Sequence, residues 1–224
     1  MARIKELVEE FKLVFTGRGG FIDTVLPPLL FLIVNAIFGF TAAMWASLGL
    51  GAALTFLRLI RKQSWTYALG GIGGAGFSVG LVLLFERSEV YFLPTLVSSA
   101  FMVIALLVSL VWKKALAAYS SHISRGWPIE WYWHERVYPA YKEVTVGWLL
   151  YSAVKLVFQV VFFMQGELSS LTWLNTLLGW PALILVLAGS YVYGLKRLSA
   201  LKGPSVEEFK AHKKSPWEGQ QRGF

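Results

Sequence analysis

Residues 91–112 read YFLPTLVSSAFMVIALLVSLVW, a stretch with no acidic, basic or histidine side chain. The hydrocarbon core of a bilayer is about 30 Å thick, and an α-helix needs roughly 20 apolar residues to cross it. A soluble domain could not cover so much apolar surface, because 56% of the 224 residues are hydrophobic and the mean hydropathy is +0.56. The stretch therefore predicts a transmembrane helix in an integral membrane protein.

Five more apolar stretches accompany this helix along the chain. We place the six predicted spans at residues 25–40, 42–60, 67–85, 91–112, 144–164 and 172–195. The loops at Phe40 and at 86–89 are so short that the spans on either side of each must be antiparallel neighbours. The predicted fold class is all-α, a polytopic membrane protein with six transmembrane helices arranged as three antiparallel hairpins.

The basic residues lie on one side of the predicted membrane. Nineteen of the 21 Lys and Arg residues precede the first span, follow the second, lie in the 113–143 loop or follow the sixth. Only Arg87 and Lys155 depart from this pattern. The positive-inside rule then places both termini in the cytoplasm. The net charge of +8 indicates contact with anionic lipid headgroups and not with nucleic acid.

Three domains follow from these patterns. Residues 1–20 alternate apolar and charged positions at helical spacing, which predicts an interfacial amphipathic helix. Residues 21–198 form the six-helix membrane domain, including the cytoplasmic loop 113–143. Residues 199–224 are polar, basic and interrupted by Pro and Gly, which is typical of a flexible cytoplasmic tail.

The 113–143 loop is rich in aromatic residues beside charges. Trp127, Trp131, Trp133 and Tyr138 are its main aromatic candidates. Amphipathic rings are stable in the headgroup layer, so we favour a helix lying at the membrane interface. The alternative is a surface on which a partner protein docks.

Glycines are concentrated in the third predicted span. Gly71, Gly73 and Gly76 match a dinucleotide-binding fingerprint, but they lie inside an apolar helix and not at a strand-to-helix turn. We therefore expect no bound cofactor. Small residues four apart let transmembrane helices approach closely. The predicted packing glycines are Gly51, Gly70, Gly74, Gly76 and Gly80.

No set of residues predicts an enzyme. Ser78 has the spacing of a hydrolase nucleophile between Gly76 and Gly80, but such a serine needs a nearby base and no predicted span contains a histidine. The chain has no cysteine. We expect no catalytic residue and no metal site, because neither a metal cluster, paired carboxylates nor a nucleophile with its base falls at one depth.

Lys155 is the polar residue that lipid would disfavour most. It stands about eleven residues into the fifth predicted span, and no predicted span offers a carboxylate at that depth. A buried ammonium costs at least about 2.5 kcal/mol on insertion scales, which makes it a functional candidate. Gln159 and Asn35 are its candidate neighbours on a transport path. The alternative is a shallow lysine that reaches the headgroups.

Asp23 and Arg58 are both predicted at the cytoplasmic boundary of the first hairpin. We expect a salt bridge between them. Such a pair would lock the hairpin, or it would serve as the mouth of a transport path or bind an anion.

Five short stretches carry a family resemblance, namely Gly19–Pro27, Arg58–Arg61, Tyr91–Pro94, Thr145–Trp148 and Leu178–Leu183. They resemble an uncharacterised bacterial membrane-protein family, domain of unknown function 3159. The likeness covers residues 19–198, although Trp112-Lys113-Lys114-Ala115 stands where the family pattern has Pro-Leu. A weaker likeness links the chain to the intracellular septation protein A group. The first resemblance implies no activity, and the second implies only an envelope or division role in the bacterial inner membrane.

The function that we expect is a non-enzymatic subunit or scaffold of the bacterial inner membrane. Its expected partners are anionic lipids and other membrane-protein subunits or further copies of the chain. The alternative is a small-solute or ion transporter, with Lys155, Gln159 and Asn35 along the path and Asp23 and Arg58 at the mouth.

Overall fold

The computed structural model describes residues 30, 33–35, 37–60 and 76–224, and it contains no strand in these ranges. The prediction of an all-α chain is confirmed for this part of the sequence. Its helices are α3 (Phe40–Ile60), an apolar helix Gly76–Phe85, η1 (Ser88–Phe92), α5 (Leu93–Val111), α6 (Leu116–Arg125), α7 (Ile129–Tyr132), α8 (Tyr138–Gln165), α9 (Leu168–Leu177), α10 (Trp180–Leu201) and α11 (Val206–Lys210).

Within the part of the chain that the structure describes, four segments are long and apolar enough to cross a membrane, namely Phe40–Leu57, Ser88–Val111, Tyr138–Gln165 and Leu168–Leu201. They correspond to the second, fourth, fifth and sixth predicted spans. Half of the first predicted span lies outside the described residues, and the third is described only over Gly76–Phe85. Six spans in three hairpins remain a prediction.

The last of these four segments is interrupted. Helix α9 ends at Leu177 and α10 begins at Trp180, with Gly179 as its N-cap and Pro181 in its first turn. Proline fits there because the first amides of a helix have no partner within the helix. The predicted single span 172–195 is therefore two helices in the structure.

The chain divides into two compact units. The first comprises Met1–Pro94 and Phe162–Thr176, and the second comprises Thr95–Val161 and Leu177–Phe224. In the first unit, α3, the helix 76–85, η1 and α9 share one small core. Its buried side chains are Ala43, Met44, Val79, Phe92 and Leu171.

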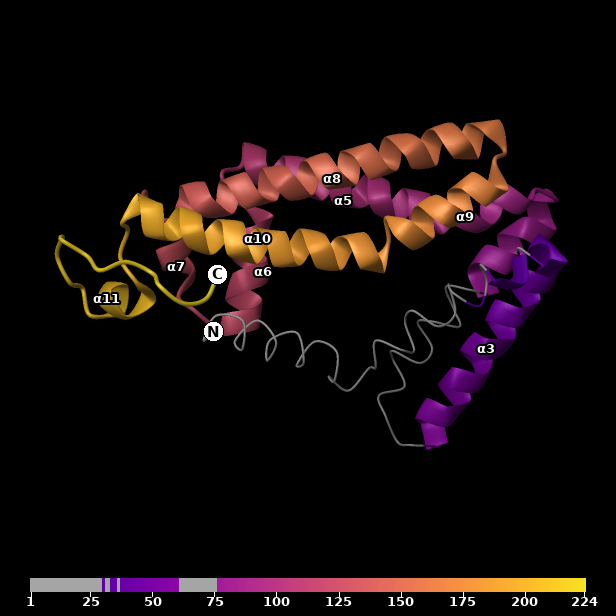
Figure 1. Cartoon of the computed structure of the whole chain (residues 1–224), viewed down its shortest axis with the longest axis horizontal. Coiled ribbons are helices and arrows are strands. Elements are labelled where there is room, and N and C mark those ends of the chain that lie inside the picture. The colour runs from indigo at the N-terminus through magenta and orange to yellow at the C-terminus, as the bar shows by residue number, and fades with distance from the viewer. Residues whose placement is uncertain (1–29, 31–32, 36, 61–75) are drawn as a thin grey trace. The chain divides into compact units, whose positions relative to one another are not determined.

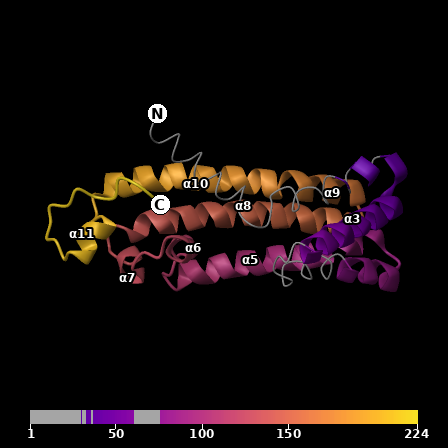
Figure 2. The same ribbon diagram turned by 90° about the horizontal axis from the view of Figure 1, so that it is seen from below.

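In the second unit, α5, α8 and α10 run alongside one another, as both views show (Figures 1 and 2). Within this second unit, the short helices α6, α7 and α11 lie together at the end where α8 begins and α10 ends (Figure 1). We call residues 115–148 and 191–224 the aromatic cap. Its buried core contains Ala115, Ala117, Ala118, Trp131, Tyr132, Val137, Ala140, Tyr141, Val144, Leu198 and Val206.

The aromatic cap corrects the expectation for Trp131. Its side chain is fully buried, and its indole N–H donates a hydrogen bond to the Pro204 carbonyl over 2.9 Å. Trp131 therefore faces neither lipid headgroups nor a partner. Pro204, which accepts this hydrogen bond, lies in the segment after α10, 73 positions from Trp131 along the chain.

The tail also differs from the flexible segment expected from its composition. Ser205 caps α11 by accepting a hydrogen bond from the Glu208 amide, while the Glu208 carboxylate accepts one from the Ser205 amide. This reciprocal arrangement satisfies two amides at the helix start. The tail is folded, because three of its side chains are buried, namely Val206, Glu208 and Gln220.

Candidate functional site

Four polar or aromatic side chains lie along one face of α8. Trp148, Tyr151, Lys155 and Gln159 are spaced by three or four residues, which brings them to the same side of a helix. The Trp148 indole donates to Ser190 Oγ on α10 over 2.8 Å, and Gln159 is 1% exposed. Polar groups within a membrane need hydrogen-bond partners inside the protein. This face of α8 therefore packs against other parts of the chain and not against lipid.

The interruption in the last segment faces Tyr151. The Tyr151 hydroxyl donates a hydrogen bond to the Leu178 carbonyl over 2.5 Å. Leu178 lies between α9 and α10, where the broken helix leaves carbonyl groups without a helical partner. Tyr151 therefore supplies one of the missing hydrogen bonds.

Lys155 stands one turn beyond Tyr151 and is half-buried. None of the salt bridges among the described residues involves its ammonium. Gln159, one turn further, occupies the same face as predicted from the four-residue spacing. Asn35 belongs to the other unit, so its place relative to Lys155 stays a prediction.

The predicted pair at the first hairpin lies outside what the structure describes. Asp23 falls in the residues that are not described, and so does the side chain of Arg58. Their salt bridge remains a prediction. The structure instead contains an ion pair that the sequence reasoning did not select.

Glu143 and Arg197 join the start of α8 to the end of α10. Arg197 Nε lies 2.8 Å from Glu143 Oε2, and Arg197 Nη2 lies 2.9 Å from Glu143 Oε1. The Tyr193 hydroxyl donates to the same carboxylate over 2.7 Å. Two parallel N–H bonds make this a bidentate pair, the strongest geometry for an arginine and a carboxylate. In the sequence, the signal for this ion pair was Glu143, a single acidic residue near the start of an apolar segment.

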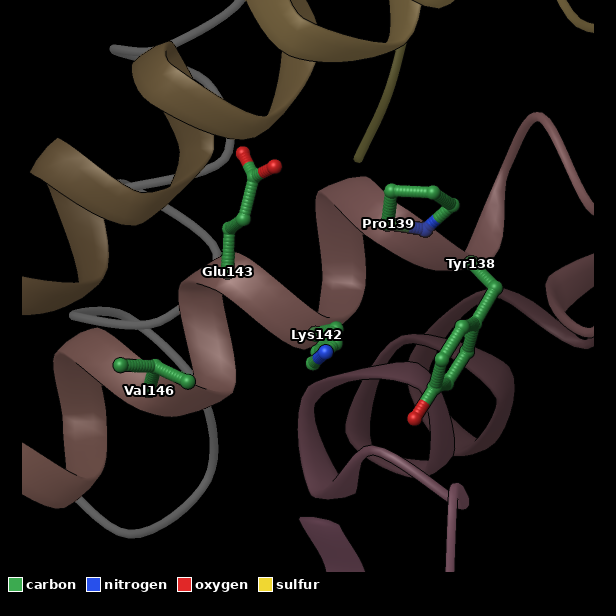
Figure 3. Close-up of a pocket in the computed structure, with 5 residues that line it drawn as sticks. All are labelled: Tyr138, Pro139, Lys142, Glu143 and Val146. Carbon is green, nitrogen blue, oxygen red and sulfur yellow. The ribbon is translucent and has the colours of Figure 1, made fainter.

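An open groove of about 440 Å³ lies beside this ion pair (Figure 3). The first turns of α8 supply all five of the described residues that line it, namely Tyr138, Pro139, Lys142, Glu143 and Val146. In Figure 3 the Glu143 carboxylate and the Tyr138 ring point to opposite sides of the helix. Because Arg197 neutralises Glu143, the Lys142 ammonium is the group left to attract an anion to the groove.

The aromatic cap is held by ring contacts around Trp131. Its ring centroid lies 5.3 Å from that of Trp127, 5.0 Å from Tyr132 and 6.1 Å from Tyr141, all in edge-to-face geometry. The Tyr132 hydroxyl donates to Ser121 Oγ over 3.1 Å, and burial raises the pKa of the Tyr132 phenol. Aromatic pairs of this kind add about 0.5–1.5 kcal/mol each beyond the area that they bury. The cap is therefore a packed structure with its own aromatic core.

Trp133 and Tyr138 lie at the edge of the cap. Both are half-buried, and their ring centroids are 6.1 Å apart. The Lys114 ammonium lies 4.1 Å from the centroid of the Trp133 ring, which is a cation–π contact. Of the four aromatic candidates, Trp127, Trp133 and Tyr138 keep some exposed surface and Trp131 does not.

Helix α6 turns an apolar surface of the cap outward. Ala117, Ala118 and Ser121 on its inner face are buried, whereas Tyr119 is 38% exposed and Ile123 is 81% exposed. These two residues were not predicted from the sequence, because only the aromatic side chains from Trp127 to Tyr138 were selected in this loop. The four-residue spacing of Tyr119 and Ile123 was the signal that could have found them.

The described packing glycines have open surroundings. Among the residues that the structure describes, no heavy atom lies within 4 Å of a Cβ built on Gly51, Gly76 or Gly80. Gly70 and Gly74 are outside the described ranges. Their roles in helix packing stay predictions. In residues 30, 33–35, 37–60 and 76–224, no group of three or more His, Asp or Glu side chains is placed to hold a metal ion.

Comparison with known proteins gives one match. The family described as "Protein of unknown function (DUF3159)" matches residues 15–200. No curated protein and no solved structure matches the chain. The resemblance to the intracellular septation protein A group is not confirmed.

Proposed function

Because the chain belongs to the DUF3159 family of proteins of unknown function, its activity must be argued from its own surfaces, and we propose that it is a non-enzymatic subunit or scaffold of the bacterial inner membrane. The aromatic cap is the part that holds a partner membrane protein. One observation carries this proposal. The interior of the cap is filled by its own buried residues, while α6 turns Tyr119 and Ile123 outward.

The cap lies on the cytoplasmic side in this proposal, with both termini in the cytoplasm. The distribution of Lys and Arg along the sequence supports this orientation. Lys113 and Lys114 precede α6, and Arg125 ends it. These charges would meet anionic headgroups while the apolar side chains of α6 contact the partner.

Photocrosslinking in the membrane of the native host tests this proposal. A photoreactive amino acid at Ile123 is compared with the same amino acid at Lys210, an exposed position on α11. The proposal predicts one discrete crosslinked product at Ile123 that Tyr119→Glu weakens, and no such product at Lys210. The absence of a product at Ile123, or the same products at both positions, would argue against the cap as a docking platform.

A transporter is the second candidate, and one observation favours it. Lys155 is half-buried on the face of α8 that meets the broken segment, and it takes part in none of the salt bridges among the described residues. Interrupted helices with unpaired backbone groups form the substrate sites of many transporters. Access of water to Lys155 separates this function from a scaffold.

A further inference from the structure

Phe224 occupies a slot in the aromatic cap. Its ring stacks on Tyr141 with the centroids 4.3 Å apart and the planes 8° from parallel. Gly194 of α10 lies against the same ring, because a Cβ built there would overlap with it. The slot therefore has room for the Phe224 ring only because position 194, in the middle of a helix, is glycine.

A polar contact fixes the main chain of this residue. Arg125 Nε donates a hydrogen bond to the main-chain oxygen of Phe224 over 3.0 Å. The Arg125 guanidinium also lies 5.1 Å from the centroid of the Trp127 ring and 5.9 Å from that of Tyr191. These rings hold the guanidinium in place as a donor. The slot thus combines a ring pocket with a charged donor for the adjacent backbone.

The position before the phenylalanine also has to be glycine. Gly223 has φ +77°, a conformation that L-residues with a side chain rarely adopt. A Cβ on Gly223 would lie 2.8 Å from a ring carbon of Trp127 and 2.9 Å from a guanidinium nitrogen of Arg125. Two independent constraints therefore select the dipeptide Gly-Phe.

Most of the tail is held by contacts that do not involve the slot. The Glu208 carboxylate accepts hydrogen bonds from the Ser205 amide at 3.0 Å and the Glu218 amide at 3.0 Å, which closes a loop. The Val206 amide donates to Gln220 Oε1 over 3.1 Å, and Trp131 bonds Pro204. These contacts hold the loop up to Gln220 without involving Gly223 or Phe224.

We propose that this slot, formed by Arg125, Trp127, Tyr141 and Gly194, is a binding site for a peptide segment that contains Gly-Phe. The chain's own Gly223-Phe224 occupies it and competes with such a segment of a partner protein. This inference rests on the proposed function, because it names the kind of segment that the cap recognises. The competition makes the tail an autoinhibitory contact.

A peptide-binding measurement on the full chain in lipid nanodiscs tests the proposal. The probe is a fluorescent peptide with the sequence of residues 219–224, GQQRGF. Phe224→Ala empties the slot, so this variant should bind the peptide at least ten-fold more tightly than the unmodified chain does. Gly223→Ala expels the dipeptide by another route and should expose the same site.

Matched controls identify the slot as the binding site. The peptides GQQRGA and GQQRAF should bind at least ten-fold more weakly than GQQRGF. Adding Gly194→Ala to Phe224→Ala should abolish binding, because the new methyl group fills the slot. Alanine is favoured in a helix interior, so the loss would not come from weakening α10.

The proposal is overturned if neither Phe224→Ala nor Gly223→Ala binds GQQRGF, or if GQQRGA binds equally well. If the peptide does not bind but Ile123 still forms its crosslinked product, the peptide site is refuted and the scaffold function stands. If the Ile123 product is lost while the peptide binds normally, the scaffold function is contradicted and the peptide site stands.

Discussion

Arg197 holds the Glu143 carboxylate through two nitrogens, at 2.8 Å and 2.9 Å, and thereby joins the end of α10 to the start of α8. The side chains are 40% and 33% exposed, so solvent weakens their attraction. The bidentate geometry still fixes the relative rotation of the two helices.

Replacing Arg197 should therefore destabilise the second unit modestly. In a double-mutant cycle of Arg197→Gln and Glu143→Gln, we expect a small favourable coupling free energy of unfolding at low salt, and a smaller one at high salt. Arg197→Lys should recover only part of it, because an ammonium cannot form the two parallel bonds. Thermal unfolding in nanodiscs measures these values. Lys142→Gln, an exposed neighbour on α8, is the control and should have little effect.

Glu208 makes the tail sensitive to strong acid. Hydrogen bonds from the Ser205 and Glu218 amides hold the pKa of this carboxyl at about 2, below its ordinary value of 4.5. Because the folded-state pKa is depressed, the stabilisation is complete above about pH 4.5 and is lost as the pH falls toward 2. The loop should remain closed at pH 5 and open near pH 2.

Hydrogen exchange of the Glu218 and Gly219 amides reports this opening, since both donate to Glu208. Glu208→Gln should open the loop at neutral pH, whereas Glu207→Gln, at the exposed neighbouring position, should not. Equal exchange in the two variants would show that the Glu208 carboxylate does not hold the loop.

Trp131 should be the residue on which the aromatic cap depends most. It is 0% exposed, and truncation to alanine leaves a cavity, which typically costs about 3–5 kcal/mol. Trp131→Phe keeps most of the apolar volume but removes the donor to Pro204, so the loss should be smaller and the tail should exchange faster. Trp133→Ala, at a half-buried position, is the comparison. A similar loss of stability for Trp131→Ala and Trp133→Ala would contradict the packing described here.

The long apolar helices were predictable from the sequence because each carries its own signal. Span length and low charge identify Ser88–Val111 without knowledge of any other part of the chain. The common face of Lys155 and Gln159 likewise follows from their four-residue spacing.

The aromatic cap was not predictable, because its burial depends on partners far away in sequence. Trp131 and the Pro204 carbonyl are 73 positions apart, and Arg125 and Phe224 are 99 positions apart. A polar tail rich in Lys and Glu has the composition of a flexible segment. Only the three-dimensional arrangement reveals that Glu208 satisfies several amides of that tail and that Gly194 makes room for a ring.

The break between α9 and α10 is an intermediate case. The predicted span 172–195 contains Pro181, and proline removes an amide donor from a helix. Its hydrogen bond from Tyr151 could not be foreseen, since that requires the relative position of α8.

The central claim is that the membrane helices serve packing and anchor the cap, and labelling at position 155 tests it most directly. The chain has no cysteine, so Lys155→Cys gives a single reactive thiol. A water-soluble, membrane-impermeant thiol reagent is applied to both sides of vesicles, with Ile123→Cys as the exposed control on the cap and Val157→Cys as the control on the outward side of α8. The scaffold account predicts that the thiol of Lys155→Cys reacts as slowly as that of Val157→Cys and far more slowly than that of Ile123→Cys. Rapid labelling of Lys155→Cys, comparable to that of Ile123→Cys, would reveal a water-filled path to the middle of α8 and contradict the account in favour of a transporter.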